Sequence, residues 1–347
     1  MRPCECNSIR CLVLSLGGGN EAARVHCTFR WRWGGVAVGC ACTAGGQTIS
    51  NRVCAARFAN KRDQLFVEAF RKGLHDVGLV ENRDVTIDIA WVANEADYSQ
   101  AIGQLLQRGA MLLVTGGSTA TAVAQRHTSN IPIIFAPAGN PVGTNFVASL
   151  SHPGGNITGF SDVLADLSGK YVQFGIQLGK PQAPIDYLWH TEWPDGKNRF
   201  DATARAAQSF GVELRARGFA HIDDANGVLS TMKKNAGAVA IVVQPSPLTN
   251  RYRGQLIASG MADGLGMIMA WPVAAREGAL IGYGPDYADM YRRVGSYVFR
   301  IVKGEKPANL PVQEPTKFPL LINTKVVKAI GVDFPPALIV AADEVID

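Results

Sequence analysis

Amphipathic helical segments alternate with short apolar segments along this chain from about residue 58 onward. Segment 61–78 places apolar residues on one stripe at helical spacing and ends at Gly78, a residue type common just after a helix. Segment 85–91 (VTIDIAW) has the pattern of a strand. The same order repeats, with helices predicted over 96–108, 118–127, 166–178, 198–209, 224–234 and 250–262 and strands over 111–115, 131–135, 186–190, 212–216, 238–243 and 267–270.

Nearly continuous apolar strands are typical of parallel sheets that helices cover on both faces, so the fold class is α/β with doubly wound parallel sheets. The length of 347 residues favours about two domains. A doubly wound sheet normally begins with a strand before helix 61–78. The stretch ISNRVCAARFAN (49–60) is a weak candidate for it. The sequence therefore leaves open whether the first sheet has its opening strand.

Residues 1–57 differ in texture from the rest of the chain, and we expect them to be poorly structured. They contain no paired Cys-x-x-Cys units of the kind a zinc site needs. The apolar runs 11–16 and 34–46 are too short or too interrupted by glycine for a typical export signal, so any such signal is atypical. All seven cysteines of the chain lie in this segment: Cys4, Cys6, Cys11, Cys27, Cys40, Cys42 and Cys54.

Charge and hydropathy exclude two classes of partner. The net charge of +5 is spread thinly, without a block of lysine or arginine, which argues against nucleic acid. No apolar run approaches the roughly 20 residues of a membrane-spanning helix. With 47% hydrophobic and 18% charged residues, the composition is that of an ordinary globular protein.

Residues suited to catalysis are scattered along the sequence. The six histidines form no His-x-x-x-His pair, there is no Gly-x-Ser-x-Gly sequence, and no cysteine follows Cys54. His190, beside Glu192, is the one candidate general base. We therefore predict a protein that is not an enzyme and needs no metal or cofactor. The alternative is a nucleotide- or sugar-using enzyme of doubly wound fold, with TGGST (115–119) as a phosphate cradle.

Two loops that follow apolar strands are candidate ligand sites, because such sheets bind ligands beyond the carboxyl ends of their strands. In TGGSTATA (115–122), Gly117 allows close approach of the backbone. Ser118 and Thr119 either cap the following helix or offer hydroxyl and N–H groups to an anion such as a carboxylate. The next loop (136–159) is long, uncharged and rich in glycine and proline.

Three stretches of the sequence carry a resemblance to a known family. FVASLSHPGGNITGFSD (146–162) and nearly all of 279–347 resemble the ABC-transporter substrate-binding proteins of tryptophan/tyrosine type, which have the type I periplasmic binding protein fold. AFRKGLHDVGLVENRDVTIDIAW (69–91) is similar to the first helix and second strand of that family. The resemblance covers about 58–347.

The resemblance implies two lobes joined by three crossings near 160–165, 283–286 and 322–325. Lobe 1 would comprise 58–162 and 285–322, and lobe 2 would comprise 163–284 and 323–347. The long uncharged loop would then form the edge of a cleft and lead into the first hinge. Function would consist of hinge closure on a small solute, an amino acid or a related polar or aromatic molecule, that a membrane permease then receives.

The resemblance also implies the ligand contacts: Gly117, Ser118, Thr119, Asn140 and Pro141 from lobe 1, Trp193, Gln244 and Trp271 from lobe 2, and Tyr283 and Asp286 near the hinge. Asn140 stands where relatives commonly have aspartate, which weakens the case for a ligand amine. Asp286 also begins a predicted helix, where capping is the favoured role. Trp189 fits either the core or the cleft wall, and Tyr291, Tyr297 and Phe299 are expected to pack.

For such a receptor, we expect the partners to be a small-molecule solute and a permease, the location to be the periplasm and the protein to be a monomer. A ligand-sensing module without transport would differ only in its partner.

Overall fold

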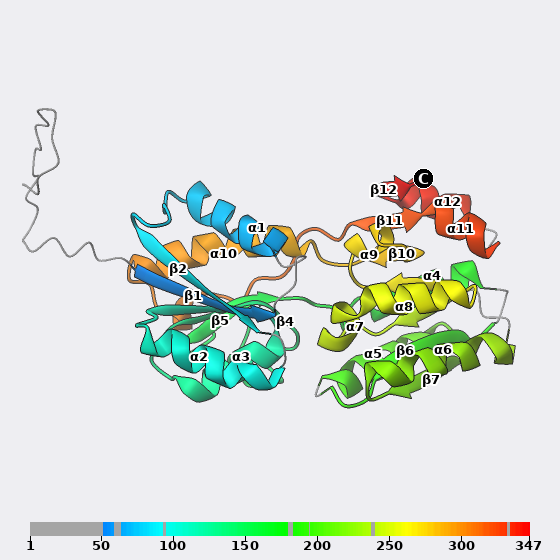
Figure 1. The fold of residues 1–347 in the computed structure, drawn as a ribbon, viewed down its shortest axis with the longest axis horizontal. Helices are drawn as coiled ribbons and strands as arrows, with labels where there is room; N and C mark the ends of the chain where they lie inside the picture. The colour runs from blue at the N-terminus through cyan, green and yellow to red at the C-terminus, as the bar shows by residue number, and fades with distance from the viewer. Residues whose placement is uncertain are drawn as a thin grey trace, which may run out of the picture. The chain divides into compact units, whose positions relative to one another are not determined.

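The computed structural model describes residues 51–58, 64–92, 95–179, 183–193, 195–236, 240–331 and 334–347. The interpretation of residues 1–50, including the atypical export signal, lies outside these residues. Contacts group Ser50–Asp347 into one compact unit, which contains two sheets (Figure 1). Within the described residues no helix combines the length and apolar character needed to cross a bilayer.

The first sheet has five parallel strands in the order β2-β1-β3-β4-β5 and forms lobe 1. Its strands are β1 (Asn51–Phe58), β2 (Val85–Val92), β3 (Leu112–Thr115), β4 (Ile133–Ala138) and β5 (Ile157–Ser161). Four helices cover it: α1 (Gln64–Asp76), α2 (Tyr98–Gln107), α3 (Ser118–His127) and α10 (Tyr287–Val302). The short 3-10 helices η2 (Glu95–Asp97) and η3 (Pro307–Asn309) complete the lobe.

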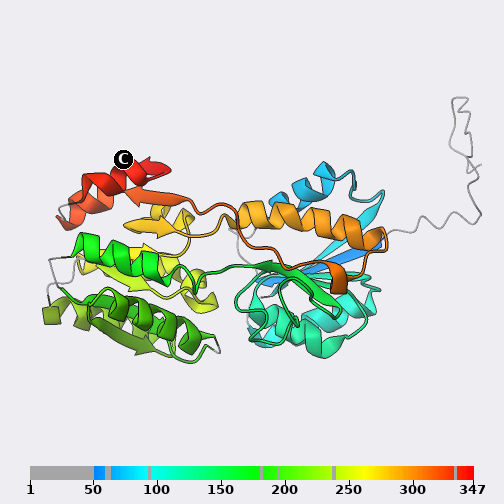
Figure 2. The same cartoon turned by 180° about the vertical axis from the view of Figure 1, so that it is seen from behind.

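The helices of lobe 1 lie on both faces of its sheet, as a doubly wound fold requires. The core on one face includes side chains from α2 and α3, and the core on the other includes side chains from α1 and α10. Helix α10 comes late in the sequence yet packs beside α1, as Figures 1 and 2 show. A Cβ built on Gly295 would lie 2.2 Å from the carbonyl carbon of Gly73, so this helix pair needs glycine at its crossing.

The opening strand of lobe 1 is present, so a first sheet without it is the wrong interpretation. Strand β1 pairs with β2 along Asn51–Phe58 and with β3 from Val53 to Ala56. The expected boundary between residues 57 and 58 is also wrong, because it falls inside this strand. A central strand gains backbone partners on both sides, and this outweighs a weak side-chain pattern.

The second sheet has seven strands in the order β12-β11-β10-β9-β8-β6-β7 and forms lobe 2. Its strands are β6 (Ile185–His190), β7 (Leu214–Phe219), β8 (Ala240–Val243), β9 (Gly266–Met269), β10 (Ile281–Tyr283), β11 (Leu320–Asn323) and β12 (Glu344–Ile346). Its helices are α4 (Ser168–Leu178), α5 (Gly196–Ser209), α6 (Ile222–Ala236), α7 (Pro247–Arg251), α8 (Arg253–Ala262), α9 (Val273–Arg276), α11 (Thr324–Ile330) and α12 (Pro336–Ala341). All neighbouring strands are parallel except β10 and β11.

The chain passes between the sheets after β5, after β10 and before β11. The third crossing, expected near 322–325, is placed wrongly: Gln313 still pairs with Phe160 of lobe 1, whereas Leu320–Asn323 already forms β11 of the second sheet. Lobe 1 therefore ends before residue 320 instead of at 322. The antiparallel pairing of β11 with β10 draws this segment into lobe 2.

Candidate functional site

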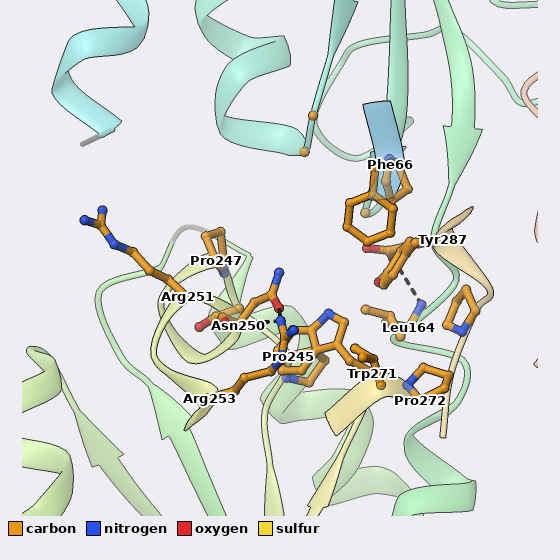
Figure 3. Close-up of a pocket in the computed structure, with 18 of the residues that line it drawn as sticks. Phe66, Leu164, Pro245, Pro247, Asn250, Arg251, Arg253, Trp271, Pro272 and Tyr287 are labelled. Carbon is orange, nitrogen blue, oxygen red and sulfur yellow. Dashed lines mark hydrogen bonds between the residues drawn. The ribbon is translucent and has the colours of Figure 1, made fainter. Parts of the chain in front are cut away.

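A cavity of about 740 Å³ lies among the loops at the strand ends of the two sheets (Figure 3). Lobe 1 contributes the loops after β3 and β4 and part of α1. Lobe 2 contributes the loops after β6, β8 and β9, and all three crossings between the lobes add lining residues, the third through Pro319 and, in β11, Leu321. The cavity thus occupies the position at which doubly wound sheets bind ligands.

The ten expected contact residues divide into two groups. Those that line the cavity are Gly117, Ser118, Thr119, Trp193, Trp271 and Asp286. Those that do not line it are Asn140, Pro141, Gln244 and Tyr283, and contact of these four with a ligand stays a prediction.

The four residues outside the cavity have structural partners instead. The Asn140 side chain accepts a hydrogen bond from Gly143 N within its own turn, and the Pro141 carbonyl accepts one from Phe146 N. Gln244 is fully buried, accepts from His190 N and donates to the Gly196 carbonyl, so it ties together the loop after β6. Tyr283 packs against other aromatic rings of the lobe 2 core.

The first turn of α3 is left uncapped by side chains. Gly117 precedes the helix with φ of 92°, a conformation that favours glycine, and none of the described side chains caps this end. Ser118 is the first helical residue, so the interpretation that it caps α3 is wrong. Its Oγ accepts a hydrogen bond from Gly139 N at 3.2 Å, which joins the loops after β3 and β4. The first-turn N–H groups therefore remain available to an anion.

Aromatic side chains from both lobes line the cavity. Phe66 of α1 meets Tyr287 edge to face at 6.2 Å, and Figure 3 shows this pair across the cavity from Trp271 and Asn250 of lobe 2. Desolvation, with the Asp162 carboxylate nearby, holds the pKa of Tyr287 well above its ordinary value, so its hydroxyl stays neutral and can donate.

The helix that begins at Tyr287 is capped as expected. Asp286 Oδ1 accepts a hydrogen bond from Asp289 N at 3.0 Å, which confirms the capping role, and the residue also lines the cavity. The packing roles expected for Tyr291, Tyr297 and Phe299 are confirmed by their places in the core between α10 and the sheet. Trp189 packs on Phe200 at 4.8 Å and belongs to the lobe 2 core.

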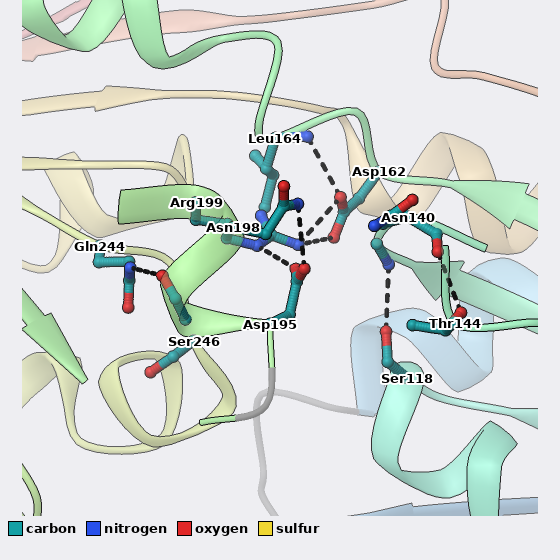
Figure 4. A network of polar contacts seen from close by, with 12 residues as sticks. Ser118, Asn140, Thr144, Asp162, Leu164, Asp195, Asn198, Arg199, Gln244 and Ser246 are labelled. Carbon is teal, nitrogen blue, oxygen red and sulfur yellow. Dashed lines mark hydrogen bonds and ion pairs between the residues drawn. The ribbon is translucent and has the colours of Figure 1, made fainter. Parts of the chain in front are cut away.

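A buried cluster around Arg199 is the main feature that the sequence did not reveal (Figure 4). Arg199 projects from α5 and is 3% exposed. Its Nε donates to Asp195 Oδ2 at 2.7 Å, and its Nη2 donates to Asp162 Oδ2 at 3.2 Å. Burial lowers the pKa of Arg199, but the two carboxylates outweigh that effect and raise it above its ordinary value. The guanidinium is therefore permanently charged.

This cluster connects the two lobes. Asp162 directly follows β5, and its N–H donates to the Ala138 carbonyl of lobe 1, whereas Arg199 and Asp195 belong to lobe 2. The Trp193 ring lies 4.9 Å from the guanidinium carbon of Arg199, a cation–π distance. The i, i+4 spacing of Asp195 and Arg199 was the one sequence pattern that could have indicated the pair.

Another charged side chain of the cavity, Arg253, has its partners within lobe 2. It donates to both carboxylate oxygens of Glu277, at 2.6 and 2.8 Å, and to Asn250 Oδ1. His190, the candidate general base, does not line the cavity, and burial lowers its pKa below the ordinary value. Among the described residues no group of histidine, cysteine and carboxylate side chains is arranged to hold a metal ion.

A sequence model of the ABC transporter substrate binding proteins matches residues 61–346. The chain belongs to this family. The two-lobe α/β architecture and the cavity between the strand ends are those of a substrate-binding protein. The family resemblance found in the sequence is therefore confirmed. Proteins of this family bind small solutes for an ABC permease, a role that involves no catalysis.

Two solved structures and one relative illustrate the likeness. The ABC domain from Streptococcus pneumonia in complex with L-Trp has a TM-score of 0.78 at 21% identity, over 86% of this chain and 100% of that one. The ligand-free, open form of a substrate binding protein with adhesive properties from Clostridium difficile has a TM-score of 0.64 at 20% identity, covering 82% and 96%. A tyrosine-binding protein from Clostridioides difficile (strain R20291) is 23% identical over 273 residues, which cover 76% of this substrate-binding protein and 75% of the relative.

Proposed function

We propose that this substrate-binding protein captures an aromatic amino acid, or a closely related small solute, and presents it to the permease of an ABC importer. The observation that carries the proposal is the cavity of about 740 Å³, whose walls combine aromatic side chains with uncapped helix donors. Cavities of roughly 300–1,000 Å³ with apolar walls and a few polar groups suit small molecules of this size.

The chemistry of the wall supports an aromatic body for the solute. Phe66, Tyr287, Trp193 and Trp271 line the cavity from both lobes and the hinge. Aromatic rings favour edge-to-face or offset contacts with another ring, with centroids about 4.5–7 Å apart. The L-Trp bound by the S. pneumonia domain and the tyrosine named for the C. difficile relative agree with this preference.

Transport would depend on movement about the crossings between the lobes. Closing on the solute brings the α3 end of lobe 1 and the α5 and α7 loops of lobe 2 against it, and the closed form is what a permease distinguishes. We place this function in the periplasm, in keeping with the role of the family. We also assign it to a monomer that binds no nucleic acid.

The direct test is ligand binding by the full-length chain. We expect L-tyrosine or L-tryptophan to raise the melting temperature, because a ligand present at 100 times its Kd stabilises the folded state by about 2.7 kcal/mol. ATP, GTP and hexoses serve as comparison compounds. Stabilisation by nucleotides or sugars alone would instead support the enzyme alternative.

Intrinsic fluorescence provides an independent measurement of the site. Trp193 and Trp271 line the cavity, whereas Trp91 lies in β2 and is 43% exposed. We expect L-tyrosine to change the tryptophan emission of the wild type and of Trp91→Phe. The change should be reduced in Trp193→Phe and Trp271→Phe. An equal response in all four proteins would place the ligand elsewhere.

A further inference from the structure

The guanidinium of Arg199 has one donor group without an acceptor. Its Nε and Nη2 bind Asp195 and Asp162, but its buried Nη1 has no hydrogen-bond partner among the described residues. A buried donor left unsatisfied is unfavourable, and a charged one more so. The Arg199 side chain also lines the cavity, so a solute that enters it can supply an acceptor for this donor.

The surroundings of Arg199 hold this donor in a fixed position. The two carboxylates fix the guanidinium plane from two edges, and Trp193 lies 4.9 Å from its central carbon. Asp195 is held in turn by Asn198 Nδ2, and Asp162 accepts a hydrogen bond from Leu164 N. A fixed planar fork loses little entropy on binding an oxygen acceptor, so the site is organised before the ligand arrives.

A second set of donors lies close to Arg199 but belongs to the other lobe. Gly139 N donates to Ser118 Oγ at the start of α3. A Cβ built on Gly139 would lie 2.3 Å from Arg199 Nη2. The Gly139 backbone thus lies between the guanidinium and the uncapped first turn of α3. One carboxylate can accept charge-assisted hydrogen bonds of about 2.8 Å from two separate donors, one through each oxygen.

We propose that Arg199 binds the carboxylate of the solute through Nη1 and that the first turn of α3, with Ser118 and Thr119, binds the same carboxylate from lobe 1. The solute class is therefore a small aromatic molecule with a free carboxylate, and Arg199 is a specificity-determining residue. This inference rests on the proposed function. It makes the carboxylate the group that both lobes hold when they close.

Selection in this arrangement comes from donor geometry and not from net charge. Asp162, Asp195 and Arg199 together are formally negative, so the cluster has no excess positive charge to attract any anion. A carboxylate accepts from both sets of donors, whereas a primary amide turns its NH₂ group toward one of them. The acid should therefore bind more tightly than the amide, and an amine that lacks the carboxylate should bind least.

The test compares matched compounds by calorimetry on the full-length chain. The probes are L-tryptophan, L-tryptophanamide, tryptamine and indole-3-propionate, with L-tyrosine, L-tyrosinamide and tyramine in parallel. For the wild type we expect the amide to bind about tenfold or more weakly than the acid, the range of a charged hydrogen bond. Indole-3-propionate should bind, because it keeps the carboxylate, and tryptamine should bind weakly or not at all.

Variants then assign the effect to Arg199. In Arg199→Gln, the difference between acid and amide should shrink to less than about threefold, since the donor that discriminates between them is gone. Arg199→Lys keeps a cation beside Asp162 and Asp195 but lacks Nη1, and it should lose the discrimination in the same way. Arg205→Gln, an exposed arginine on the same helix, should retain the wild-type difference.

The outcomes separate this inference from the proposed function. If acid and amide bind the wild type equally, the solute carboxylate is not recognised and the inference is overturned, while the proposed function stands. If the acid–amide difference persists in Arg199→Gln and Arg199→Lys, the α3 turn alone reads the carboxylate and the role of Arg199 is overturned. If no compound of either series binds, the proposed function fails and the inference fails with it.

Discussion

Arg199 of lobe 2 donates a hydrogen bond of 3.2 Å to Asp162, the residue that directly follows the last strand of lobe 1. Both side chains are almost fully buried, at 4% and 11% exposure. A buried ion pair of this kind does not necessarily stabilise a protein, but the loss of one partner leaves an unpaired charge in a poorly solvated place. The pair therefore makes the packing of the two lobes sensitive to either residue.

Removal of the Arg199 side chain should lower the free energy of unfolding substantially. Arg199→Ala leaves Asp162 and Asp195 buried without their cation, and we expect a loss of about 3–5 kcal/mol. Urea denaturation of the ligand-free protein measures it. Lys197→Ala is the matched control on the same helix, because the Lys197–Asp201 pair is exposed and such pairs contribute about 1 kcal/mol or less. Equal losses for the two variants would show that the cluster is not the buried pair described.

Backbone strain at the first crossing gives a second prediction. Val163 has φ of 47°, a left-handed conformation that is unfavourable for a β-branched side chain. The other non-glycine residues with positive φ in the described chain are all asparagine: Asn82, Asn140 and Asn145. Val163→Asn should therefore raise the free energy of unfolding by about 1 kcal/mol, since strain of this type costs about 1–3 kcal/mol.

The control for that substitution is Val142→Asn, at an exposed valine that does not have positive φ. Its effect on urea denaturation should stay within about 0.5 kcal/mol, as is usual for surface changes. A destabilised Val163→Asn would show that the valine side chain contributes more to the hinge through packing than it costs in strain.

The sequence predicted the elements of this fold well wherever local pattern and tertiary packing agree. Helix 118–127 was predicted with the bounds that α3 has, because its small and polar residues end at a charged last turn before a strand. The predicted helix 250–262 is two helices, α7 and α8, with Tyr252 between them. Ser246 and Thr249 form a capping box that starts α7 earlier than its apolar pattern indicated.

The sequence was less informative about the site, because the site depends on contacts between segments far apart in the chain. Ser118 and Thr119 could be singled out because the glycine-rich loop that contains them follows an apolar strand. Asn140 was predicted to contact the ligand because it lies in a turn after β4, but its side chain accepts a hydrogen bond from Gly143 N within that turn. Arg199 lies within an ordinary polar helix, α5. Only the tertiary fold places Asp162, the residue after β5, next to it. Asp162 and Arg199 are 37 residues apart in the sequence, so no local sequence pattern can reveal their contact.

Titration of His190 gives a pH-dependent prediction. Burial lowers the pKa of His190 in the folded protein below the ordinary value of 6.5. The unfolded chain therefore binds a proton more readily, so the contribution of this group to stability is present above about pH 6.5 and is lost as the pH falls through the folded-state pKa. Stability should decline on acidification from pH 7 toward 5.

Comparison of variants isolates this effect. Urea midpoints at several pH values should fall less steeply below pH 6.5 for His190→Gln than for the wild type. His152→Gln, in an exposed loop, should follow the wild-type curve. Parallel curves for His190→Gln and wild type would mean that His190 does not change its proton affinity on folding.

Contact between α1 and α10 gives the last prediction, because it joins the first helix of the fold to the return segment of lobe 1. A Cβ on Gly295 would lie 2.2 Å from the carbonyl carbon of Gly73, and backbone atoms cannot yield as a flexible side chain can. Gly295→Ala should therefore force the helices apart and destabilise the protein by about 1–3 kcal/mol or more, the range seen for overpacking.

Gly227→Ala is the matched control in α6, where a Cβ meets nothing within 4 Å. That substitution should stabilise its helix by about 0.5–1 kcal/mol. Urea denaturation should therefore show changes in the free energy of unfolding of opposite sign for the two variants. A stabilised Gly295→Ala would show that α1 and α10 do not cross this closely.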